Sequence, residues 1–206
     1  HSVQQTTDGG YIINGYTSSF GNGNTDVYLI KTDGNGIEQW SKTFGGTDDD
    51  WGLSVQQTTD GGYITIAHTE SFGNGGGDAY LIKTDGNGNE EWTKTFGGIY
   101  EDGGNSVQQT TDGGYIICGE TESFGNGGGN DIYLIKTDGN GNEEWTKTFG
   151  GTDDDEGYSV QQTTDGGYIV TGYTESFGNG DEDVYLIKTD GNGIELWSKT
   201  FGGTDD

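Results

Sequence analysis

The sequence contains no proline, no methionine and no arginine, and it has a single cysteine, Cys118. One cysteine cannot form an internal disulfide bond, and it leaves no cysteine pair for a metal site. We expect Cys118 to fill space inside a strand, as buried free cysteines usually do. No apolar run approaches the ~18 residues that a membrane-spanning helix needs, so we expect no membrane insertion.

Positive charge is also scarce. The chain has 8 lysines against 35 acidic residues, which gives a formal net charge of −27. Such a chain repels nucleic acid and anionic membranes, so we exclude nucleic acid as a partner and favour cations or cationic partners. Aromatic residues make up 12% of the chain at regular intervals, which is more than a disordered acidic chain carries. The composition therefore predicts a folded acidic protein.

The sequence is built from tandem repeats. The segment SVQQTTDGGY begins at Ser2, Ser54, Ser106 and Ser159, with spacings of 52, 52 and 53 residues. A fixed period of this length is typical of repeat architectures. We therefore treat residues 1–206 as a single repeat domain with repeats 2–53, 54–105, 106–158 and 159–206.

Each repeat contains four β-rich runs separated by glycine, asparagine and aspartate, which suit tight turns. In the first repeat we expect strands at 2–7, 11–17, 26–32 and 37–44. The third run is apolar on both faces, as in a sheet that lies between two others. Four-stranded antiparallel sheets repeated radially are β-propeller blades. The predicted fold is an all-β propeller with four blades per chain.

Two segments carry a family resemblance. DVYLIKTDGNGIEQWSKTFGG from Asp26 and TTDGGYIINGYTSSFG from Thr6 resemble the extracellular SBBP-type β-propeller repeats of bacterial and archaeal surface proteins. The first segment is also more distantly similar to PQQ-type propeller repeats. The resemblance implies a structural or binding module that is secreted or displayed on the cell surface, and it implies no catalytic residue.

The sequence leaves three alternatives for the number of blades: four blades in one chain, eight blades from two chains, or blades that continue into repeats outside this chain. Four blades can close alone, and this arrangement is slightly favoured because it uses every repeat and needs no partner. Two chains can instead form an eight-bladed ring, because each end of the array exposes the kind of face that internal blades bury. The second alternative predicts a homo-oligomer.

Carboxylates between the repeats are candidate calcium ligands, because Ca²⁺ binds clusters of oxygen atoms. These candidates are Asp48, Asp49, Asp50, Asp153, Asp154 and Asp155. The alternative is a solvated acidic rim. Calcium is the only cofactor that the sequence suggests.

Repeated aromatic residues are candidates for binding sugars, because their rings can stack on sugar faces and one weak site per blade would add avidity. These candidates are Phe20, Phe72, Phe124, Phe177, Tyr16 and Tyr173. The alternative is that the phenylalanines cover blade edges.

The sequence offers little for catalysis. A Ser-His-Asp triad needs a positioned histidine, and the chain has only His1 and His68. A glycosidase needs two carboxylates in different environments, and we find no such asymmetric pair. We therefore expect a non-enzymatic module for assembly, adhesion or protein interaction, with itself or surface glycans as partner. The alternatives are a multivalent carbohydrate- or calcium-binding propeller and a fragment of a larger propeller enzyme.

Overall fold

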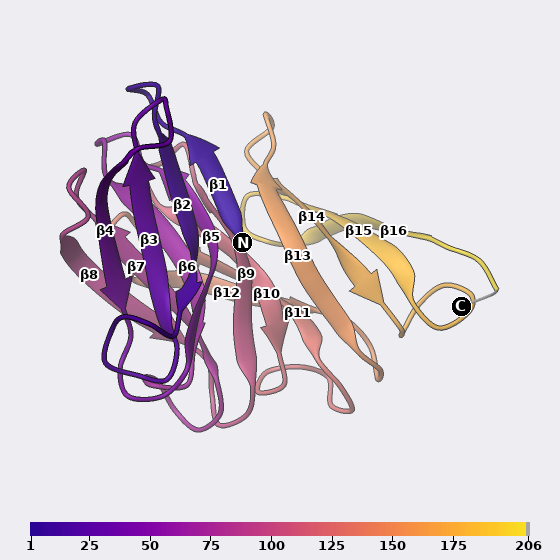
Figure 1. The fold of residues 1–206 in the computed structure, drawn as a ribbon. Helices are drawn as coiled ribbons and strands as arrows, with labels where there is room; N and C mark the ends of the chain where they lie inside the picture. Colours follow the sequence, from indigo (N-terminus) through magenta and orange to yellow (C-terminus); the bar gives the residue numbers. More distant parts are fainter. Residues whose placement is uncertain (205–206) are drawn as a thin grey trace.

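The computed structural model describes residues 1–204, which form four four-stranded antiparallel sheets and their loops (Figure 1). We call these sheets blades 1 to 4. Blade 1 contains β1 (Ser2–Gln5), β2 (Tyr11–Thr17), β3 (Asp26–Thr32) and β4 (Glu38–Phe44). Blade 2 contains β5 (Asp50–Gln57), β6 (Tyr63–Thr69), β7 (Asp78–Thr84) and β8 (Glu90–Phe96). Blade 3 contains β9 (Asp102–Gln109), β10 (Tyr115–Thr121), β11 (Asp131–Thr137) and β12 (Glu143–Phe149). Blade 4 contains β13 (Asp155–Gln162), β14 (Tyr168–Thr174), β15 (Asp183–Thr189) and β16 (Glu195–Phe201).

Every blade is a simple meander, in which each strand pairs with the next strand along the chain. The all-β prediction is confirmed, and the expected strands 11–17 and 26–32 match β2 and β3. The first strand of blades 2 to 4 begins earlier than expected. In blade 2 it begins at Asp50, which pairs with Thr69, and a bulge follows between Gly52 and Ser54. The repeat boundaries drawn at serine therefore cut through this strand.

The blades follow one another in an arc, and each junction encloses a hydrophobic core. At the first junction, Val27, Leu29 and Phe44 of blade 1 pack against Val55 and Tyr63 of blade 2. Burying side chains of this size contributes roughly 1.5–3 kcal/mol each, so the junctions carry much of the stability. Cys118 fills space in the third junction and is fully buried, as expected.

The closed four-bladed ring is not formed, because the outward face of blade 4 has no neighbour. Val184 is 52% exposed and Phe201 is 56% exposed. The corresponding residues of blade 1, Val27 and Phe44, are 0% and 9% exposed under blade 2. The arc is open at this point. Within residues 1–204, no helix is long and apolar enough to cross a membrane.

Candidate interaction surfaces

The outward face of blade 4 is an uncovered hydrophobic surface. Val184 and Phe201 are cross-strand partners on β15 and β16, so their side chains lie side by side on one face of the sheet. Trp197, which pairs with Lys188 on the same face, is 43% exposed. We call Val184, Trp197 and Phe201 the blade 4 end face. These residues match Val27, Trp40 and Phe44 of blade 1, where a following blade covers them.

The inward face of blade 1 is uncovered as well. Val3 on β1 is 65% exposed, whereas Val55 at the same position in blade 2 is 6% exposed. Tyr11 on β2 is half-buried, whereas Tyr63 is 2% exposed. We call Val3 and Tyr11, with Gly36 in the turn between β3 and β4, the blade 1 end face.

The internal junctions show how two such faces meet. The ring of Trp40 in blade 1 lies 5.8 Å from the ring of Tyr63 in blade 2. The same ring closes over the β7–β8 turn, where a Cβ on Gly88 would lie 2.6 Å from it. The tryptophan–tyrosine contact repeats at the other two junctions, with centroid distances of 5.8 Å.

The blade 4 end face carries the tryptophan of this contact and the blade 1 end face carries the tyrosine and the turn, but within one chain the two faces do not meet. A Cβ on Gly36 would have nothing within 4 Å, although Gly36 corresponds to Gly88. Trp197 stacks on no aromatic ring within the described part of the chain. The chain therefore presents a tryptophan at one end and an empty place for a tryptophan at the other.

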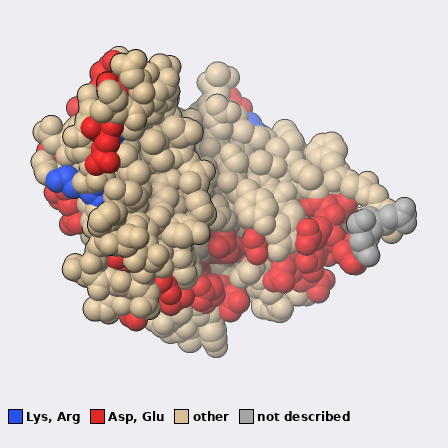
Figure 2. Space-filling model, in the orientation of Figure 1, with Lys and Arg blue, Asp and Glu red and all other residues tan. Residues whose placement is uncertain are grey.

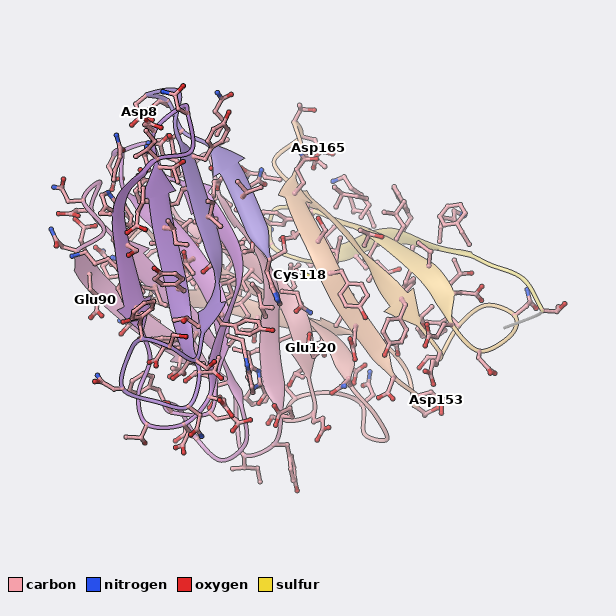
Figure 3. The ribbon with its side chains drawn as sticks, viewed as in Figure 1. Asp8, Glu90, Cys118, Glu120, Asp153 and Asp165 are labelled. Atoms are coloured by element: carbon pink, nitrogen blue, oxygen red, sulfur yellow. The ribbon has the colours of Figure 1, made fainter. Side chains whose placement is uncertain are left out.

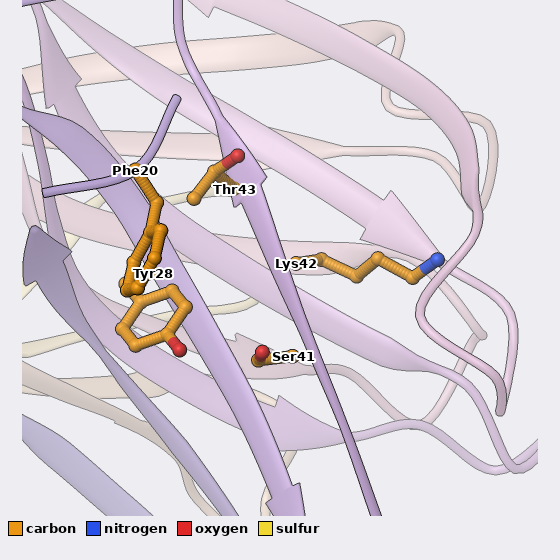
Figure 4. A pocket seen from close by; sticks show the side chains of 5 residues that line it. All are labelled: Phe20, Tyr28, Ser41, Lys42 and Thr43. Atoms are coloured by element: carbon orange, nitrogen blue, oxygen red, sulfur yellow. The ribbon is translucent and has the colours of Figure 1, made fainter.

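The phenylalanines expected to bind sugars line shallow grooves on the outer strands. Phe20 lies 6.0 Å from Tyr28, between ring centroids, above Ser41, Lys42 and Thr43 (Figure 4). The corresponding groove of blade 2 is lined by Phe72. The groove of blade 4 is lined by Phe177. The three grooves have volumes of about 240, 220 and 400 Å³. Phe124 makes the same contact with Tyr133, at 5.7 Å.

Tyr16 and Tyr173 do not join these grooves. Tyr16 pairs with Val27 across β2 and β3, so it points to the face opposite Tyr28. Its ring contacts His1 instead, at a centroid distance of 5.1 Å. Tyr173 stacks on Tyr158, at 5.9 Å. The six aromatic candidates therefore form two separate groups.

The four repeats carry different residue types near the end of the second strand of each blade. A single position on the second strand of each blade carries Tyr16, His68, Glu120 and Tyr173 in turn. His68 Nε2 lies 3.1 Å from Oε1 of Glu101. Glu120 lies at the end of the molecule that also carries Asp153 (Figure 3). Figure 2 shows acidic side chains gathered along this lower part of the molecule.

Glu120 has an unusual environment that the sequence did not reveal. Its Oε2 accepts a hydrogen bond from Nδ2 of Asn105, at 2.6 Å. Burial and the nearby carboxylate of Glu156 raise the pKa of Glu120 to about 7. The signal in the sequence is weak, because this position varies among the repeats but so does the position of Asn14, Ile66, Cys118 and Thr171 on the same strand.

The acidic triplets expected to bind calcium are split by the fold. Asp50 and Asp155 begin strands and are fully buried, whereas Asp48 and Asp153 are exposed in the loops. Asp49 and Asp154 are half-buried, and Oδ1 of Asp154 accepts a hydrogen bond from the backbone N–H of Asn130. Within residues 1–204, no three or more His, Cys, Asp or Glu side chains converge on a point that could hold a metal ion.

At the opposite end of each blade, a lysine on the third strand donates hydrogen bonds to several acceptor groups. In blade 2, Nζ of Lys83 donates to Asp60 at 3.0 Å, to Glu91 at 2.8 Å and to the carbonyl of Thr84 at 3.0 Å. Burial opposes ionisation of Asp60, but hydrogen bonds from Thr58, Gly62 and Lys83 outweigh it and lower its pKa to about 2. These contacts fasten the turn before β6 to the end of β7.

Comparison with known proteins places the chain only broadly. No family model matches it. Regulatory protein FlaEY of Caulobacter vibrioides is 27% identical over 198 residues, a match that covers 84% of this chain and 20% of that protein. The chain thus spans a fifth of the length of this relative.

The fold also occurs among solved structures. A candidate glycoside hydrolase from Parabacteroides distasonis matches 97% of this chain and 71% of that chain, with a TM-score of 0.51 and 12% sequence identity. At this identity the likeness concerns the fold alone. The fold and the end faces define this chain as an all-β tandem-repeat protein made of four-stranded blades.

Proposed function

We propose that the chain is a non-enzymatic β-propeller module that assembles with further copies of itself, outside the cell or on its surface. The observation that carries this proposal is the pair of end faces. Trp197 and Phe201 have the same types and positions as residues that pack into all three internal junctions, and Val184 corresponds to the buried Val27, Ala79 and Ile132. A second copy presents Val3, Tyr11 and Gly36. These residues correspond to Val55, Tyr63 and Gly88, which the same kind of face contacts at the first internal junction.

The energetics favour contact between these faces. Large side chains such as Trp197 and Phe201 lose exposed apolar area on docking, at roughly 25 cal/mol per Å². Association also has a free-energy cost, because the chains lose translational and rotational freedom. The burial of Trp197, Phe201 and Val184 must offset this cost. At the internal junctions, the corresponding side chains pack into continuous hydrophobic clusters.

The contact is heterologous, because the end face of blade 4 meets a different face on the next copy. Heterologous contacts close into a ring when the rotation allows it, and otherwise they continue as a filament. Four blades form an open arc in one chain (Figure 1). Two chains closing one eight-bladed ring is the arrangement that we favour.

Light scattering of matched variants tests this proposal. One chain has a mass of 21.9 kDa. We expect the wild-type protein to show at least twice this mass, and Val184→Glu to show the mass of one chain. Ile194→Glu is the control, because Ile194 is 58% exposed and corresponds to Asn142, whose side chain contacts Lys94 of the preceding blade and so lies away from the blade 4 end face. A wild-type monomer at all concentrations would exclude self-assembly.

A second function, multivalent carbohydrate binding, is favoured by the repeated grooves. Phe72 stacks on Tyr80 at 5.3 Å and remains 41% exposed, so part of an aromatic face is open to a ligand. Thr93 and Thr95 supply hydroxyl groups at the same groove. A glycan array tests this function. Binding that Phe72→Ala weakens, and that the exposed control Ile99→Ala does not, would support it.

A further inference from the structure

Two buried carboxylates face each other at every blade junction. The aspartate that begins the third strand of one blade lies beside the aspartate that begins the first strand of the next blade. The pairs are Asp26 with Asp50, Asp78 with Asp102, and Asp131 with Asp155, and no member is more than 2% exposed. The same arrangement therefore occurs three times within one chain.

A glycine lies beside the two aspartates of each pair, and at the first and third junctions it leaves room between their carboxylates. A Cβ on Gly45 would lie 2.5 Å from Oδ1 of Asp26 and 2.5 Å from Oδ2 of Asp50. At the third junction, a Cβ on Gly150 would overlap Oδ1 of Asp131 and lie 2.7 Å from Oδ2 of Asp155. Oxygen atoms of both carboxylates thus border one small space, which any side chain on the glycine would occupy.

Backbone and hydroxyl donors hold these carboxylates in place. Oδ2 of Asp50 accepts hydrogen bonds from the backbone N–H of Gly46 at 2.8 Å and from the hydroxyl of Ser71 at 2.7 Å, and the hydroxyl of Thr69 donates to Oδ1. Oδ2 of Asp78 accepts the backbone N–H of Asn74 at 2.8 Å. Donors of this kind favour the ionised form of a carboxyl group.

At the second and third junctions, some carboxylate oxygen atoms have no partner. Oδ1 of Asp78, Asp131 and Asp155 is buried and accepts no hydrogen bond. None of the ion pairs among residues 1–204 includes a member of the three aspartate pairs. A buried carboxylate without a partner is costly, and pairing with a cation removes that cost.

We propose that each junction binds one Ca²⁺ ion between its two aspartates, and that the ion fastens adjacent blades together. Ca²⁺ takes six to eight oxygen ligands in flexible geometry, which two carboxylates, loop carbonyls and water can supply. Zinc and other ions that prefer nitrogen or sulfur are disfavoured, because neither His nor Cys belongs to the pairs. Three junctions predict three ions per chain. Blade 4 carries the corresponding Asp183 but has no following blade to complete a pair.

This inference is independent of self-assembly, because all three pairs lie within one chain. It also differs from calcium binding by the acidic loop triplets, since only Asp50 and Asp155 of those triplets take part. The partners that complete the sites, Asp26 and Asp131, come from the third strands, about 24 residues away in sequence.

Isothermal titration of the chelator-treated chain with CaCl₂ tests the inference. We expect three ions per chain and a higher melting temperature with Ca²⁺ than with chelator. Asp78→Asn, which keeps the side-chain shape, should reduce the count to two, whereas the control Asp48→Asn should leave it at three. Circular dichroism checks that both variants fold.

Two outcomes would overturn the inference. Absence of calcium binding by the folded wild-type protein would mean that protons, not metal ions, neutralise the pairs. A count that Asp48→Asn lowers and Asp78→Asn does not would place the ions on the exposed rim. The wild-type stoichiometry decides the matter even if a variant fails to fold.

Discussion

The side chain of Gln4 accepts, at Oε1, a hydrogen bond from the backbone N–H of Gln57 in the next blade, with a distance of 2.6 Å. The same bond joins Gln56 to Gln109 at 2.6 Å and Gln108 to Gln162 at 2.6 Å. The inner strands of neighbouring blades do not pair through their backbones, so these glutamines connect them instead.

Removing one of these glutamines should weaken a junction. We expect Gln56→Ala to lower the free energy of unfolding by about 1–2 kcal/mol, because the partly buried N–H of Gln109 loses its acceptor. Gln161 has no following blade, so Gln161→Ala should change stability by less than about 0.5 kcal/mol. Urea denaturation of both variants measures the difference. Equal losses would mean that the glutamine bond contributes nothing.

The buried lysine of blade 2 makes a second prediction. The side chain of Lys83 is 3% exposed, and its positive charge forms ion pairs with Asp60 and Glu91. Lys83→Met keeps most of the volume but removes three donated hydrogen bonds, so we expect a loss of about 1–3 kcal/mol. Lys94→Met is the control, because Nζ of Lys94 contacts a single exposed partner, Asn142. Thermal unfolding compares the two, and a similar small effect in both would show that the buried network does not stabilise the fold.

Glu120 predicts a pH-dependent stability. Its pKa is about 7 in the folded protein, raised by burial and by Glu156, whereas the ordinary value is 4.5. The folded state therefore binds the proton more tightly than the unfolded state does. The stabilisation is complete below about pH 4.5 and is lost as the pH rises through about 7, for a total of about 3 kcal/mol.

Glu120→Gln should remove this dependence. We expect the variant to be more stable than the wild-type protein at pH 8 and to lose less stability between pH 5 and pH 8. Glu156, Glu101 and Asp102 stay in place around the new amide, and Asn105 can still donate to its oxygen. Glu122→Gln, at an exposed position, should leave the wild-type profile unchanged. Identical profiles for Glu120→Gln and the wild-type protein would contradict the assigned environment.

The strands were predictable because their signals are local. Residues 11–17 and 26–32 are β-rich runs bounded by glycine, asparagine or aspartate, and the structure reproduces them. The early start of the inner strands was not predictable from such signals. Asp50 reads as part of an acidic turn, and it joins a strand because Thr69 in the neighbouring strand pairs with it.

The interaction surfaces could not be predicted from the sequence, because they depend on contacts between blades and the sequence of one repeat does not specify those contacts. The environment of Glu120 requires Asn105 from β9 and Glu156 from β13, far apart in the sequence. The open arc depends on the angle at which Val27 and its neighbours pack against the next blade. The separation of Tyr16 from Phe20 was in principle predictable, because alternate residues of a strand point to opposite faces.

Docking between the end faces is tested most directly by cross-linking two cysteine variants. At an internal junction, Nζ of Lys94 lies 3.1 Å from Oδ1 of Asn142 in the next blade. Lys199 and Ile37 hold the corresponding positions on the blade 4 and blade 1 end faces. Cys118 is fully buried, so it should not react.

We predict that a short bismaleimide joins Lys199→Cys to Ile37→Cys in a mixture of the two proteins, giving a product of two chains. A mixture of Lys199→Cys with Glu90→Cys, an exposed position away from both end faces, should give little of this product. No excess of the first product over the second, in folded protein, would contradict docking of blade 4 on blade 1 of another copy.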